Sequence, residues 1–166
     1  MLRMLIDMSR KPSAIAQELH QTKAFDSPED EAAVALLRTV DLLRADLERA
    51  LAPRSITPQQ YNVLRILRGS HPEPLATLEI ADRMIERAPG ITRLLDRLEA
   101  ARLVSRKRCG EDRRIVHCSI TRDGLAVLAA LDEPVREIGQ KRVGRLSKSQ
   151  LANLLQLLDR IREEVS

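Results

Sequence analysis

The stretch EDRRIVHCSITRDG, residues 111–124, indicates the fold of this chain most clearly. In its middle, apolar and polar residues alternate, so that Val116, Cys118 and Ile120 share one face of a strand. The preceding run, 103–109, has the length and composition of a partner strand. Turn residues separate the two runs, and we therefore predict an antiparallel β-hairpin with strands near 103–109 and 115–121.

The tip of this hairpin is basic. Gly110 and Asp112 are turn residues, and an aspartate at such a place commonly accepts a hydrogen bond from its own turn backbone. Arg113 and Arg114 follow directly, so their long side chains would extend beyond the strands. We expect both to reach a phosphate or a narrow minor groove. Alternatively, Arg114 could pair with an acid and support the hairpin.

Three helical patterns precede the hairpin. One runs from Pro58 to about Arg68, and a loop beginning at Gly69 is expected after it. The next begins near Thr77, with an expected core-facing set of Leu78, Ala81 and Ile85. After a break at 88–90, the last has apolar residues at i, i+3, i+4 and i+7: Ile91, Leu94, Leu95 and Leu98. Helix, tight turn and helix make a helix-turn-helix, with 91–100 as the recognition helix.

Five spaced residues also resemble a family signature. The pattern D-x-R-x-x-x-x-x-L-T-x-x-G of the multiple-antibiotic-resistance regulator (MarR) family is matched here, with isoleucine in place of leucine, by Asp112, Arg114, Ile120, Thr121 and Gly124. The order of helices and strands over 28–166 resembles that family as well. The resemblance implies a bacterial transcriptional regulator, mainly α with a small two-stranded β-wing, in which a winged helix-turn-helix DNA-binding lobe joins a helical dimerisation lobe.

The resemblance also implies how the chain is divided. Residues 1–27 would form an N-terminal extension, 28–56 and 122–166 a helical dimerisation region, and 57–121 the winged helix-turn-helix. In the family, the first and last helices of two subunits interlock. Helices predicted over 28–52 and 148–165 agree with this, because each has more apolar stripe than one small domain needs. The expected dimer contacts are Leu36, Leu43, Leu151, Leu155 and Leu158.

Positive charge is concentrated around the recognition helix and the hairpin. Residues 83–114 hold ten Arg or Lys against five Asp or Glu, a local balance of +5 in a chain of net charge +4. This is the electrostatic footprint of a phosphate-backbone partner. Aromatic residues make up only 1% of the chain, which argues against modules that stack single-stranded bases.

The candidate DNA contacts follow from the face of the recognition helix opposite its leucines. Arg93 is the first choice for a base contact and Arg97 the second, because arginine can bind guanine through two hydrogen bonds. Their competing interpretation is a solvated surface paired with Asp96 and Glu99. The full predicted set is Pro89, Gly90, Thr92, Arg93, Arg97, Arg106, Arg108, Arg113 and Arg114, with Asp112 shaping the wing turn.

The start of that helix departs from the resembled family, which commonly places Ser or Thr there. This chain has Ala88, Pro89 and Gly90, none of which supplies a capping hydroxyl. Uncapped N–H groups at a helix start can instead bind a phosphate oxygen.

On this basis we expect a homodimeric repressor or activator, with repression the favoured role, that binds a pseudo-palindromic operator in double-stranded DNA. The resemblance further implies a small-molecule effector of unknown identity. Two alternatives stay open at this point: a winged-helix module for protein contact that does not bind specific DNA, and a redox-responsive regulator that uses Cys109.

Other functional classes find little support. The two cysteines give no disulfide framework and suit a reducing cytoplasm. His20, His71 and His117 lack the close spacing of a zinc site, so no metal and no cofactor are expected. Nucleotide-binding and nucleophile motifs are not found, which argues against an enzyme. The N-terminal MLRMLIDM run is too short for a membrane span.

Overall fold

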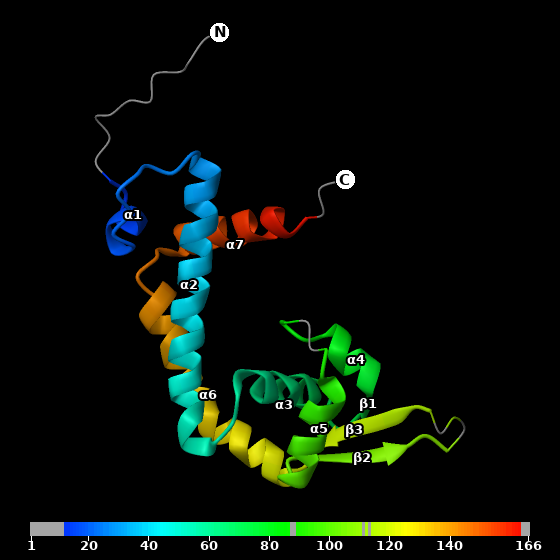
Figure 1. Ribbon diagram of the computed structural model, residues 1–166. Coiled ribbons are helices and arrows are strands. Elements are labelled where there is room, and N and C mark those ends of the chain that lie inside the picture. The colour runs from blue at the N-terminus through cyan, green and yellow to red at the C-terminus, as the bar shows by residue number, and fades with distance from the viewer. Residues whose placement is uncertain (1–11, 87–88, 111, 113, 164–166) are drawn as a thin grey trace. The chain divides into compact units, whose positions relative to one another are not determined.

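The computed structural model describes residues 12–86, 89–110, 112 and 114–163 (Figure 1). The chain divides into two compact units, Met1–Leu42 and Leu43–Ser166. In the first unit, Ser13 caps the short helix α1, Ala14–Glu18. An ion pair at 2.7 Å joins Glu18 to Arg38.

Helix α2, Pro28–Leu51, begins in the first unit and ends in the second. The Ser27 hydroxyl accepts a hydrogen bond from the backbone of Asp30 at 3.1 Å, which satisfies a free donor of its first turn. A 3₁₀ turn, Ala52–Arg54, follows, and it contains Pro53, whose ring cannot continue the α-helical hydrogen bonds.

Helix α3, Pro58–Ser70, lies within the second unit. A capping box formed by Thr57 and Gln60 fixes its first turn. The helix extends two residues into the segment expected to be a loop, because a single glycine lowers helix stability without forbidding it. The first proline, Pro72, comes only after its end.

Helix α4, Thr77–Asp82, is shorter than expected, and its predicted core face was wrong. Ile80 is fully buried, whereas Leu78 and Ile85 are 76% and 85% exposed. The buried face of α4 is therefore formed by other residues than the predicted ones. Since the helix ends at Asp82, Ile85 lies beyond it. Helix α5, Ile91–Ala100, agrees with the prediction and buries Leu94, Leu95 and Leu98.

The sheet has three strands, so the two-stranded wing was an incomplete prediction. Strand β2, Val104–Arg108, pairs antiparallel with β3, Val116–Ile120, as expected. A third strand, β1, Leu75–Ala76, pairs with the other edge of β3, giving the order β1-β3-β2. Two residues are too few to show an alternating pattern, which is why sequence reasoning missed β1.

Two helices complete the second unit: α6, Arg122–Val143, and α7, Lys148–Arg162. The signature residue Thr121 caps α6, because its hydroxyl accepts a hydrogen bond from the backbone of Gly124 at 3.1 Å. Helix α6 contains Pro134. A capping box of Ser147 and Gln150 starts α7.

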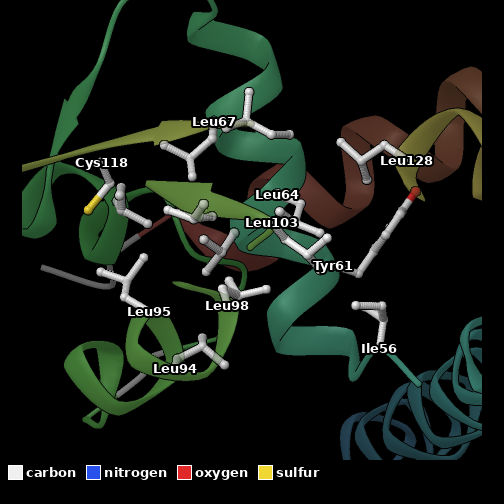
Figure 2. Close-up of a cluster of buried hydrophobic side chains, with 14 of the residues drawn as sticks. Ile56, Tyr61, Leu64, Leu67, Leu94, Leu95, Leu98, Leu103, Cys118 and Leu128 are labelled. Carbon is white, nitrogen blue, oxygen red and sulfur yellow. The ribbon is translucent and has the colours of Figure 1, made fainter. Parts of the chain in front are cut away.

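A single hydrophobic core holds α3, α5, the sheet and the start of α6 together (Figure 2). Leu64, Leu98 and Leu128 are fully buried and come from three of these helices. Gly124 permits the close approach of α6 to the loop before β2. A Cβ atom at Gly124 would lie 2.3 Å from the carbonyl oxygen of Leu103, closer than any real contact. The lack of space for a side chain therefore explains the glycine at this signature position.

Candidate nucleic-acid interface

Helix α5 separates an apolar face from a basic one. Its three leucines at 94, 95 and 98 lie in the core, while the side chains of Thr92, Arg93 and Arg97 are exposed. This is the division that the helical spacing predicted. A helix held to the core by one face and basic on the other has the form of a recognition helix.

Arg106 of β2 packs against α5 and bonds to its acidic residues. The guanidinium of Arg106 lies 2.7 Å from Asp96, and its Nε donates to Glu99 at 2.8 Å. Only 23% of the Arg106 side chain is exposed. The hydrogen bond to Glu99, followed by that to Asp96, raises the pKa of Arg106 against the opposing effect of burial. This network ties the wing to the helix.

The same network changes the interpretation of Arg93 and Arg97. Their competing interpretation was a surface paired with Asp96 and Glu99, but those carboxylates are bound by Arg106. Across the described residues, neither Arg93 nor Arg97 forms an ion pair. Both guanidinium groups are thus available to an external partner. Arg106, predicted as a DNA contact, is placed between helix and wing.

At the wing, Asp112 shapes the turn as predicted. Its Oδ1 accepts a hydrogen bond from the backbone of Arg114 at 2.9 Å, and its carbonyl accepts from Ile115 at 3.0 Å. Arg108 and Arg114 are exposed. Within the part of the chain that the structure describes, Arg114 forms no ion pair. Arg113, also predicted as a contact, lies outside the described residues.

The start of α5 lacks a side-chain cap, as expected from its sequence. Gly90 occupies the N-cap position without a side-chain hydrogen bond, and a Cβ atom there would meet nothing within 4 Å. Pro89, Gly90, Thr92 and Arg93 line one shallow hollow. The first N–H groups of the helix therefore open onto a surface that carries an arginine. Ala88 lies outside the described residues.

Two residues that the sequence did not indicate hold the segment between α4 and α5. The side-chain oxygen of Asn62 accepts a hydrogen bond from the backbone of Ile85 at 2.9 Å. Arg44 of α2 bonds to Glu86 at 2.6 Å. These partners are 23 and 42 residues apart, so no local pattern could have related them.

The cysteines differ in their surroundings. Cys118 is fully buried, and burial raises the pKa of its thiol, which favours the unreactive protonated form. Cys109 is half-buried just after the end of β2. Among the described residues there is no group of three or more side chains that could hold a metal ion. Within the same residues, no helix is both long and apolar enough to cross a membrane.

Taken together, these elements define a winged helix-turn-helix. The MarR family model matches residues 56–116. The chain is 31% identical over 108 residues to the uncharacterised HTH-type transcriptional regulator YpoP of Bacillus subtilis, covering 65% of this chain and 75% of that protein. It is 44% identical to a MarR transcription factor of known structure from Planctomyces limnophilus, with a TM-score of 0.65 and coverage of 82% and 98%.

The chain therefore belongs to the MarR family of transcriptional regulators. A further solved structure concerns the regulation of DNA binding of Bordetella bronchiseptica BpsR by 6-hydroxynicotinic acid. That protein shares the fold, with a TM-score of 0.72, 20% identity, and coverage of 80% of this chain and 99% of that one. The predicted family and the mainly α, winged fold are confirmed. The matched relatives are regulators, not enzymes, as expected.

Proposed function

We propose that this protein is a homodimeric repressor that binds a pseudo-palindromic operator in double-stranded DNA. One observation carries the proposal. Arg93 and Arg97 project from α5 without an ion pair in the described chain, while Arg106 binds the two carboxylates beside them and offsets part of their negative charge. An acidic side chain near phosphates would otherwise repel DNA.

In this proposal the helix and the wing have different tasks. Arg93, and then Arg97, contact bases in the major groove, while Arg108 and Arg114 contact phosphates or the minor groove. The N–H groups at Gly90 are suited to a phosphate oxygen. Arg106 holds α5 against the wing and is not assigned a DNA contact. A module for protein contact alone would have no need for exposed, unpaired arginines on both elements.

The dimer is supported by apolar residues that the chain does not cover. Leu155, Leu157 and Ile161 of α7 are 56%, 55% and 62% exposed, and α2 exposes Leu37 and Val40. Of the predicted contacts, Leu151 and Leu155 are exposed, whereas Leu36, Leu43 and Leu158 are half-buried. A monomer would leave these stripes in water. We propose that 28–56 and 122–166 form the dimerisation region and 57–121 the DNA-binding region.

The dimer has a direct test. Leu155→Asp places a charge in the proposed interface and should convert a dimeric mass in light scattering to a monomeric one, with loss of operator binding. Leu78→Asp is a matched control for the mass alone, because Leu78 is exposed but lies on α4, outside the proposed interface. A wild-type protein that is monomeric at micromolar concentration would overturn the proposal.

We further propose regulation by a small, anionic or phenolic effector, acting in the cytoplasm, where the DNA would be found. In BpsR, a protein of the same fold, DNA binding is regulated by 6-hydroxynicotinic acid. Binding of effector and operator would then be coupled reciprocally, so that an effector that weakens DNA binding is itself bound less tightly in the presence of DNA.

The DNA-binding assignment is tested by comparing two arginines. Arg93→Ala should cost about 1 to 3 kcal/mol on the cognate operator and much less on a scrambled duplex, because base contacts specify. Arg114→Ala should weaken binding to both duplexes alike. It should also lower the salt slope by about 0.9 for each phosphate that is no longer neutralised, and by about twice that in a dimer, where two wings change.

Both variants are titrated at several salt concentrations beside Arg136→Ala. Arg136 is an exposed arginine of α6 whose ion pair with Glu133 is local. It should behave as the wild type. If Arg93→Ala lowered the affinity for both duplexes equally, that face of α5 would not be the one that recognises bases. Binding that does not depend on salt concentration would favour a protein-contact module instead.

A further inference from the structure

Asp46 is the one charged side chain that is buried among the described residues, and it lies outside the DNA-contacting elements. Only 6% of it is exposed. It belongs to the last turns of α2, and Nε of Arg142 in α6 donates to its Oδ2 at 2.5 Å. Arg49, one turn further along α2, bonds to its Oδ1. Asp46 and Arg142 are 96 residues apart in sequence. We call this pair the α2–α6 clamp.

The clamp fixes a geometry more than it adds stability. A buried ion pair loses much of its attraction to desolvation, and an apolar pair in its place is often as stable. A guanidinium, however, binds a carboxylate along defined directions, so the pair specifies how its two helices meet. The hydrogen bond from Arg142 lowers the pKa of Asp46 although burial opposes this, which keeps the carboxylate charged.

The end of α2 that carries the clamp is attached at further points. Leu51 is fully buried in the core. Arg44 bonds to Glu86, which lies in the segment shortly before α5. Arg44 and Glu86 are 50% and 43% exposed, so that pair is weak by itself. The Asp46–Arg142 clamp to α6 is therefore the more buried of the two polar contacts that fix the last turns of α2, the other being Arg44–Glu86.

We propose that the Asp46–Arg142 clamp determines which half-site spacing the dimer accepts. This inference rests on the proposed function, because it needs two DNA-binding lobes. Helix α2 continues from the clamp to the leucines assigned to the dimer interface. The way its last turns are fixed to α6 then determines where each lobe stands on DNA. The separation of half-sites follows from that geometry. Asp46 and Arg142 are positioning residues and need not touch DNA.

The experiment uses operators in which the half-sites have the preferred separation or are shifted by one base pair in either direction. Arg142→Lys keeps the positive charge but loses the directed hydrogen bonding of a guanidinium group. Asp46→Asn keeps the shape of the side chain but loses its negative charge. Arg136→Lys, on the same helix and paired only locally, is the matched control. Light scattering and thermal melting show that each variant is a folded dimer at the assay temperature.

We expect both clamp variants to lose spacing preference. The affinity ratio between the preferred and the shifted operator should fall by about fivefold or more, the range of a typical coupling between sites. The control should keep the wild-type ratio. A structural role alone would lower the melting temperature but leave the ratio of the folded dimer unchanged, and that result overturns the inference. If one variant fails to fold, the other decides.

The wild-type protein tests the proposed function separately. A wild-type dimer that binds DNA with a clear spacing preference supports it before any variant is made. Wild-type protein without such a preference overturns both the proposed operator and this inference. Unchanged preference in folded clamp variants overturns the inference alone.

Discussion

Helices α5 and α7 both repeat leucine at helical spacing, yet the two helices have opposite surroundings. In α5, Leu95 and Leu98 are 0% exposed, because α3 and the sheet pack against them. In α7, Leu155 and Leu157 are 56% and 55% exposed. The periodicity of a helix thus shows that one face needs a partner, but it does not show whether that partner belongs to the same chain.

The largest effect that would test this comparison is a truncation in the core. Leu98→Ala should lower the free energy of unfolding by about 2 to 5 kcal/mol, because a fully buried leucine leaves a cavity. Chemical denaturation measures this loss, which should not change the concentration dependence. Leu155→Ala is the counterpart. Its cost should appear as a weaker dimer, so that its midpoint becomes more sensitive to protein concentration.

If both substitutions cost the same at every concentration, the leucines of α7 are covered within one chain. The contrast between the two helices would then be lost, and with it the main support for the proposed dimer.

A somewhat smaller loss is expected where α6 begins. Gly124→Ala places a Cβ atom 2.3 Å from the carbonyl oxygen of Leu103 and 2.7 Å from a side-chain carbon of Ile120. The helix would have to move, at a cost of about 1 to 3 kcal/mol. Gly139→Ala, in the same helix, meets nothing within 4 Å and should be neutral or slightly stabilising. Thermal melting compares the two, and equal losses would refute a steric cause.

Much of the DNA-binding unit could be predicted because its signals are local. The leucines of α5 and the turn at Asp112 each depend on residues within a few positions. Local rules of this kind transfer directly from sequence to structure. The wrong prediction for Leu78 also came from a local pattern. A helix as short as α4 has too few residues to show which of its faces is buried.

The ion-pair networks could not be predicted. Asp46 and Arg142 are distant in sequence, and the pairing of Arg106 with Asp96 and Glu99 depends on how β2 packs against α5. The arginine-rich sequence showed that positive charge gathers there, but it did not show which arginines are bound internally and which are available. That distinction requires the fold.

A smaller effect concerns acid. Because the pKa of Asp46 lies below its ordinary value of 3.8 in the folded protein, the charged carboxylate stabilises the fold above that value. Its contribution is lost as the pH falls below 3.8 toward the lower pKa of the folded state. The difference in unfolding free energy between wild type and Asp46→Asn should be constant from about pH 5 to 7 and shrink at lower pH. A difference that grows on acidification would contradict the assignment.

The smallest effect is expected at the two cysteines, one of which is buried and the other half-buried. Cys118 is fully buried with a raised pKa, and Cys109 is only half-buried at the wing. Replacing them with alanine and serine, respectively, should change operator affinity and effector response by no more than about twofold, the usual range for substitutions away from a binding contact. Fluorescence titration with and without peroxide measures both. Peroxide-induced release of DNA that is present in the wild type and abolished in the Cys109→Ser, Cys118→Ala variant would show a redox-responsive regulator instead, and Cys109→Ser alone would then show whether the accessible thiol is its sensor.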